Sequence, residues 1–104
     1  MALTDRENAA LQDPDVRFGF DNSEVLQKLG EFVRTMRSES SLSQQALQAR
    51  SGISQADISR LESAAMDKGP LLMTLVRLAR ASNHQLVIGL KNGQTQQITQ
   101  LLEL

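Results

Sequence analysis

The chain has 104 residues, which is enough for one domain with one modest hydrophobic core. Its hydrophobic content of 40% includes only three Phe and no Trp or Tyr, so the core must be aliphatic. Six Gly and two Pro are too few for a turn-rich all-β fold, and a helical domain is expected. With no Cys and a single His, the sequence excludes disulfides and thiolate metal sites, and we expect neither a metal nor a cofactor.

Two further classes of protein are not expected. The N-terminus has no apolar signal segment and no run reaches the ~18 apolar residues of a membrane span, which predicts a soluble cytoplasmic protein without membrane contact. The only histidine, His84, has no nucleophile motif near it, while Gly89 and Gly93 are isolated and form no phosphate-binding loop. We therefore expect that the chain is not an enzyme.

The net charge of −1 conceals an uneven distribution along the chain. Residues 1–30 contain three basic and six acidic residues, a balance of −3, whereas residues 31–80 contain seven basic and five acidic residues, a balance of +2. Residues 81–104 balance at zero. An acidic arm thus precedes a mildly basic centre, a pattern that does not identify a nucleic-acid-binding protein by itself.

Residues 1–22 are interpreted as an acidic arm attached to the main domain. Asp13-Pro14 is a favourable N-cap and first-turn pair, so short helical turns are expected in the arm. An apolar patch surrounds Gly19 and is formed by Val16, Phe18 and Phe20. The simplest interpretation is that this patch folds back to cover the helical core.

Apolar periodicity predicts four helices between residues 23 and 84. The first begins near Ser23 and carries apolar residues at steps of three and four, namely Val25, Leu29, Phe32, Val33 and Met36. The second begins at the N-cap Ser43 and ends before Gly52, which can adopt a positive φ, and Ser54 caps the third. The fourth carries Leu72, Leu75, Val76 and Ala79. This pattern predicts an all-α, compact domain of four to five helices.

The segment at residues 85–91 is short, β-branched in its middle and followed by the turn signal Asn92-Gly93, which predicts one C-terminal β-strand. The tail at residues 94–104 has apolar residues at helical spacing and is interpreted as a helix or a frayed end, with a hairpin back across Asn92-Gly93 as an alternative. A single strand has no partner in its own chain, but pairing with a second copy would satisfy its backbone. Residues 85–104 are therefore predicted to form a homodimer through the strand residues Leu86, Val87, Ile88, Gly89 and Leu90.

Two short helices joined through a Gly turn form a device that docks in the major groove of DNA. Close packing of such helices is favoured here by the inward residues Leu47, Ile53, Ile58 and Leu61. Base edges would be reached by the short side chains at the start of the second of these helices, Ser54, Gln55, Ala56 and Asp57. Residues 42–62 resemble the phage-repressor (Cro/cI or XRE) helix-turn-helix family. The features that agree are the two N-caps, the glycine between the helices and the four inward positions. The resemblance covers roughly residues 25–83 and implies a lambda-repressor-like DNA-binding domain at residues 23–84.

The resemblance also implies roles for individual residues. Gln44, together with the helix start at Ser43, would hold a phosphate, since free amides at a helix N-terminus attract anions. Bases would be contacted from the exposed side of the next helix, by Gln55, Ala56 and Arg60, with Ser59 beside them. Arg37 and Glu62 would form the family's buried ion pair and would be structural.

Two departures from the family pattern change these expectations. Gln48 stands where the family has Ala, so either the packing there is loosened or Gln48 turns outward. Ser63-Ala64-Ala65-Met66 stands where the family ends the recognition helix with a Gly. We therefore expect a longer recognition helix and a phosphate-contacting loop shifted to residues 67–69, with Lys68 as its cation.

A strand directly after such a domain further resembles antitoxins of the HipB and HigA type. The first interpretation is therefore an antitoxin that represses its own toxin–antitoxin operon and binds the cognate toxin. A stand-alone transcriptional repressor is the alternative, and both would bind double-stranded DNA at a palindromic operator as homodimers. A third interpretation is an interaction module that no longer reads DNA. A neighbouring toxin gene would distinguish the first two.

Overall fold

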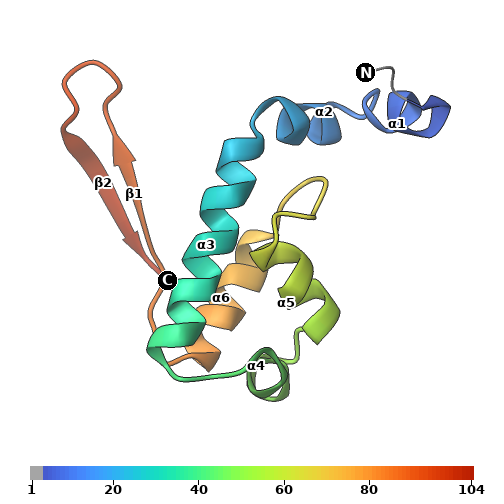
Figure 1. Cartoon of the computed structure of the whole chain (residues 1–104). Helices are drawn as coiled ribbons and strands as arrows, with labels where there is room; N and C mark the ends of the chain where they lie inside the picture. The colour runs from blue at the N-terminus through green and yellow to red at the C-terminus, as the bar shows by residue number, and fades with distance from the viewer. Residues whose placement is uncertain (1–3) are drawn as a thin grey trace.

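Six helices and one two-stranded sheet make up residues 4–104, the part of the chain that the computed structural model describes (Figure 1). The helices are α1 (Asp5–Ala10), α2 (Pro14–Asp21), α3 (Ser23–Glu39), α4 (Gln44–Ser51), α5 (Gln55–Glu62) and α6 (Leu72–Ala81), and the strands are β1 (Val87–Lys91) and β2 (Ile98–Glu103). Helices α5 and α6 pack against α3, and α4 packs against α5 and α6, whereas α1 and the hairpin extend away from α3 (Figure 1). The first three residues of the predicted arm lie outside the described part of the chain.

The core lies where α3 to α6 meet, and it is aliphatic as predicted. Its buried hydrophobic residues are Val33, Met36, Leu47, Ile58, Leu61, Val76, Leu78, Ala79 and Leu86. Helix α3 closely approaches α5 at Gly30, where a Cβ would lie 2.5 Å from the carbonyl oxygen of Leu61. The buried face of α3 therefore runs through Gly30, and two apolar residues predicted to point inward, Val25 and Phe32, are 44% and 50% exposed.

The recognition helix is shorter than predicted. Helix α5 ends at Glu62, and Ala64 adopts a left-handed conformation with φ of 58°. The amide of Ala64 donates to the carbonyl oxygen of Leu61 (3.2 Å) and that of Ala65 donates to Arg60 (2.7 Å). This bond pair is the Schellman motif that normally uses Gly, so the longer helix was a wrong expectation.

The N-terminal arm is helical, but it does not cover the core. Helix α2 begins as predicted, with the Asp13 carboxylate accepting a hydrogen bond from the amide of Asp15 (2.9 Å). Because α2 is a helix, Val16 and Phe20 lie on one face and Phe18 on another. The buried residue of α2 is Gly19, whereas Phe18 and Phe20 are 67% and 60% exposed. The predicted apolar cover is therefore wrong.

The C-terminal segment forms a hairpin, which confirms the alternative expectation and corrects the prediction of one strand without a partner in its own chain. Strands β1 and β2 pair antiparallel from Val87↔Glu103 to Lys91↔Ile98, with an irregularity between Leu90 and Lys91. Because Asn92 accepts bonds from two amides of the connecting loop, the tail turns back and is neither helix nor frayed end. Among residues 4–104, no helix is both long enough and apolar enough to cross a bilayer.

Candidate nucleic-acid interface

Helices α4 and α5 meet at a sharp turn whose geometry depends on Gly52. Gly52 has a φ of 75° and donates its amide to the carbonyl oxygen of Gln48 (2.9 Å). The guanidinium of Arg77, from α6, donates to the carbonyl oxygen of Ser51 (2.8 Å). A Cβ at Gly52 would lie 2.7 Å from Nη2 of Arg77, so this position accommodates both the backbone conformation and the guanidinium.

The N-terminus of α5 is capped from two directions. Oγ of Ser54 accepts a hydrogen bond from the amide of Asp57 (3.1 Å), as an N-cap does. Oε1 of Gln48 accepts a hydrogen bond from the amide of Gln55 (2.5 Å). Gln48, which stands where the family has Ala, was expected either to loosen the helix packing or to turn outward. It is exposed and therefore turns outward. The bond from Gln48 links α4 directly to the start of α5.

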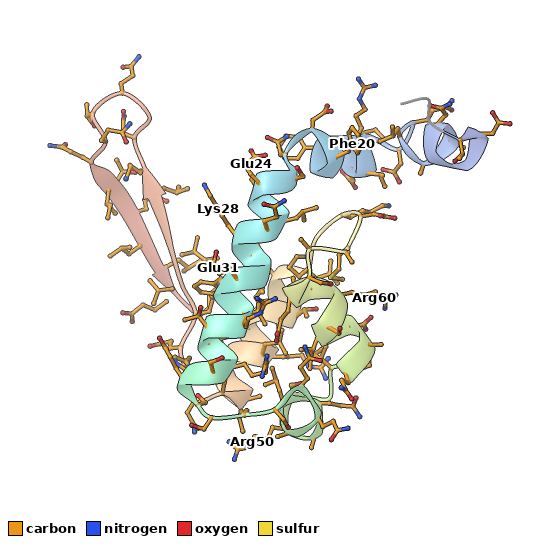
Figure 2. All side chains as sticks on the ribbon, viewed as in Figure 1. Phe20, Glu24, Lys28, Glu31, Arg50 and Arg60 are labelled. Atoms are coloured by element: carbon orange, nitrogen blue, oxygen red, sulfur yellow. The ribbon has the colours of Figure 1, made fainter. Side chains whose placement is uncertain are left out.

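The residues predicted to read bases lie on the outer side of α5. Ala56, Ser59 and Arg60 are exposed and Gln55 is half-buried. Figure 2 shows Arg60 extending from α5 away from α3. Its guanidinium forms an ion pair with the carboxylate of Asp57 on the same helix, and hydrogen bonds from Arg60 and then Ser54 hold the pKa of Asp57 below its ordinary value. In the free protein, the recognition face thus carries an arginine already oriented by a neighbouring carboxylate.

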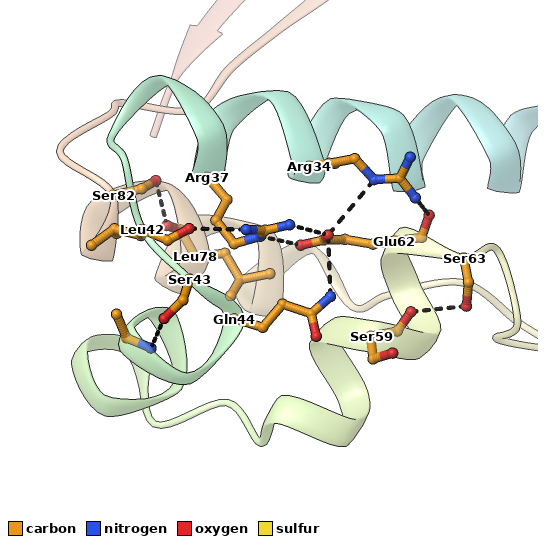
Figure 3. A network of polar contacts seen from close by, with 11 residues as sticks. Arg34, Arg37, Leu42, Ser43, Gln44, Ser59, Glu62, Ser63, Leu78 and Ser82 are labelled. Carbon is orange, nitrogen blue, oxygen red and sulfur yellow. Dashed lines mark hydrogen bonds and ion pairs between the residues drawn. The ribbon is translucent and has the colours of Figure 1, made fainter.

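Behind this face, Arg37 and Glu62 form a buried, bidentate ion pair between α3 and α5 (Figure 3). Nε and Nη2 of Arg37 each donate to a carboxylate oxygen of Glu62 at 2.8 Å, and Nη1 donates to the carbonyl oxygen of Leu42 (2.9 Å). Burial alone would raise the pKa of Glu62, but the hydrogen bonds from Arg37 and Gln44 outweigh it, and the pKa lies below its ordinary value. The pKa of Arg37 is raised by the same carboxylate. The pair fixes the position of α5 on α3.

The two side chains predicted to hold phosphates have protein partners in the free state. Nε2 of Gln44 donates to Oε1 of Glu62 (3.3 Å), so Gln44 joins the network behind α5. Lys68 forms an ion pair with Asp13 of the arm (2.8 Å), which raises the pKa of Lys68 and lowers that of Asp13. Ser43 accepts the amide of Ala46 (3.0 Å) and caps α4.

Two contributors to the site were not found from the sequence. Arg77 fixes the turn, and Arg34 donates to the backbone carbonyl of Glu62 (3.2 Å). Both contacts join residues more than 25 positions apart, and neither arginine occupies a position that the helical periodicity singles out. Only the packing of α3 and α6 against the motif brings them there.

Helix α4, the turn at Gly52 and α5 together form a helix-turn-helix, the class of DNA-binding unit that places its second helix in the major groove. The model of the helix-turn-helix domain family matches residues 28–86, which is more than half of the chain, and the chain belongs to this family. Comparison with curated proteins and with solved structures gave no match. Family membership supports DNA as a partner of the chain and a role in transcription regulation.

Proposed function

We propose that this protein is a sequence-specific repressor of the phage-repressor (Cro/cI or XRE) type that binds a palindromic operator as a homodimer. The observation that carries the proposal is the exposed outer side of α5, where Arg60 and the start of the helix stand on a rigid two-helix unit. Arg60 has the donor geometry that guanine accepts, and Gln55 the bidentate geometry that suits adenine. Ser43 and Gln44, at the start of α4, would contact phosphates from the helix N-terminus.

Selection of bound sequences from a random duplex pool, followed by gel shifts, tests this function. We expect Arg60→Ala and Gln55→Ala each to cost about 1–3 kcal/mol on the selected sequence and to relax the preference at one base pair. Arg17→Ala is the matched control, because Arg17 is equally exposed but lies on the arm and pairs with Asp21. An equal loss on all sequences would assign Arg60 and Gln55 to the DNA backbone. Failure to select any sequence would leave an interaction module that does not read DNA.

A second candidate function, the antitoxin, is favoured by the aromatic residues of the arm. Phe18 and Phe20 are exposed on a short acidic helix outside the helix-turn-helix, and such surfaces are typical of protein-binding sites. We propose that, in an operon with a toxin gene, this arm binds the toxin while α5 binds the operator. The double variant Phe18→Ala/Phe20→Ala should then lose toxin neutralisation in co-expression but keep operator binding. Unchanged neutralisation would place the toxin-binding surface outside the arm, and absence of neutralisation by the wild type would leave the stand-alone repressor as the function.

A further inference from the structure

The β1–β2 hairpin carries exposed apolar side chains on both of its faces. Residues opposite one another in an antiparallel pair share a face, so Ile88 with Leu102 lies on one face and Gly89 with Leu101 on the other. Leu102 is 54% exposed and Leu101 is 68% exposed, and their neighbours Leu90 and Val87 are 56% and 48% exposed. A two-stranded hairpin is marginally stable in water, and this one has both faces to cover.

Burial falls steeply along β1 because the hairpin diverges from the helices. Leu86 at its base is 6% exposed and belongs to the core, Ile88 is half-buried, and Leu90 is mostly exposed. Figure 1 shows β1 and α3 separating from a common base. The radius of gyration is 15.7 Å, whereas a compact domain of this length has about 13 Å. The hairpin therefore projects from the domain, whereas α2 of the arm packs on it at Gly19, where a Cβ would lie 2.5 Å from the carbonyl oxygen of Asp67.

A second apolar surface lies beside the hairpin, on the helices. It is a groove of about 420 Å³ between α3, the start of α6 and β1, and its lining is almost entirely apolar: Val25, Leu29, Phe32, Leu72, Val87 and Ile88. Leu72 is 47% exposed, and the exposed fractions of Val25 and Phe32 are similar. The groove and the hairpin are continuous, since β1 forms one wall of the groove.

We propose that the occupant of this groove is the hairpin of a second copy, so that two copies exchange hairpins across a two-fold axis. A hairpin that is apolar on both faces needs two covering surfaces. The second copy supplies both, because its hairpin can cover one face and its groove the other. This inference deepens the homodimer of the proposed function by naming its surface. The reciprocal contact is isologous, as closed dimers require, and it leaves α5 of each copy free for DNA.

Both surfaces carry exposed charges of both signs. The side of α3 that borders the groove carries the exposed residues Glu24, Lys28 and Glu31 (Figure 2). The hairpin carries Lys91 near its tip and Glu103 near its base, both exposed. A reciprocal arrangement offers Glu103 a cation and Lys91 a carboxylate on the partner, around an apolar centre. Such a charged rim and apolar centre are characteristic of protein interfaces.

Sedimentation of the full chain with charge variants tests the surface. We expect a dimer whose dissociation constant rises at least 100-fold in Val25→Glu, on the groove, and in Leu90→Glu, on the hairpin. Phe18→Glu and Leu71→Glu are matched controls, because Phe18 and Leu71 are 67% and 77% exposed and lie outside the groove. The controls should remain dimeric. A monomeric wild-type chain, or equal effects of all four variants, would overturn the proposal.

Cross-linking gives a readout that does not depend on how well these variants fold. The sequence has no Cys, so Val25→Cys and Leu90→Cys each introduce a single thiol. A short bifunctional maleimide should join the two variants when they are mixed, and much less when Leu90→Cys is mixed with Phe18→Cys. A stable dimer without the Val25–Leu90 product would overturn the groove and favour pairing along the strand edges. The DNA selection distinguishes failure of the interface from failure of the proposed function. A dimer that selects no DNA sequence would keep the interface and remove the proposed function. A monomer that selects a sequence would remove the interface and keep sequence-specific DNA binding.

Discussion

Replacing Arg37 with Ala should remove much of the stability of the domain while leaving the recognition face unchanged. The side chain of Glu62 is only 3% exposed and receives two hydrogen bonds of 2.8 Å from Arg37. Without Arg37, the carboxylate keeps one hydrogen bond, from Gln44 (3.3 Å), and a longer ion-pair contact with Arg34 (3.8 Å). Breaking a buried pair on one side costs about 3–5 kcal/mol, because the other charge stays buried. A domain of this size loses about 4–8 °C in Tm per kcal/mol, so Tm should fall by at least about 12 °C.

The chain offers a matched control for this experiment. Arg34 contacts the same carboxylate, but it is 58% exposed and its Nε lies 3.8 Å away, so Arg34→Ala should cost less than about 1 kcal/mol. Thermal melts followed by circular dichroism measure both variants, and gel shifts at low temperature measure DNA affinity per folded molecule. A Tm of Arg37→Ala that matches that of Arg34→Ala would refute the reasoning, because it would mean that Glu62 is solvated when Arg37 is absent.

The same pair predicts how stability depends on pH. The pKa of Glu62 is lower in the folded protein than in the unfolded chain, so the unfolded chain binds the proton first. The stabilisation is therefore complete above the unfolded pKa, about 4.3, and is lost as pH falls through the folded pKa. We expect the Tm of the wild type to fall more steeply below pH 4.3 than the Tm of Glu62→Gln. Parallel curves for the two proteins would contradict this assignment.

Three further variants test separate features. Ala64→Gly should raise the free energy of unfolding by about 0.5–1 kcal/mol, because the left-handed strain of about 1–2 kcal/mol exceeds the added entropy of the unfolded chain; a lower Tm would contradict this. Gly52→Ala should cost more in the wild type than in an Arg77→Ala background, where only the strain of the positive φ remains, and equal costs would show that the guanidinium moves aside freely. Asp13→Asn keeps an N-cap for α2 but frees Lys68, so the slope of log affinity against log salt should steepen by up to about 1; an unchanged slope would place Lys68 off the DNA.

The helix-turn-helix could be predicted from the sequence because its signals are local. Ser43 and Ser54 cap helices with their own side chains, and Gly52 supplies the positive φ between them. The end of α5 could not be predicted in the same way, since Ala64 takes a left-handed conformation that its side chain disfavours. The two backbone hydrogen bonds that close the helix accompany that conformation, and a sequence pattern does not show them.

The hairpin and the arm show a second limit of sequence patterns. Ile98, Leu101 and Leu102 have the spacing of a helix, yet they form a strand because β1 lies opposite them. For Phe18, alternation suggested burial, but the N-cap Asp13 and Pro14 start a helix that turns the ring outward. In both cases the apolar residues could be recognised from the sequence, but their secondary structure could not. It depends on a strand distant in the sequence for the hairpin and on a helix N-cap for the arm.

The base of the hairpin has a consequence for the spacing of DNA half-sites. Leu86 is in the core, the amide of Leu104 donates to the carbonyl oxygen of Leu86 (2.8 Å), and Arg80 of α6 donates to Leu104 (2.7 Å). These bonds fix the hairpin to the domain that carries α5, so a dimer held by hairpins holds its two recognition helices at one separation and one angle. One inserted base pair turns a half-site by about 34° around the duplex axis. A dimer of this kind therefore distinguishes operators by the helical phase of their half-sites as well as by their sequence.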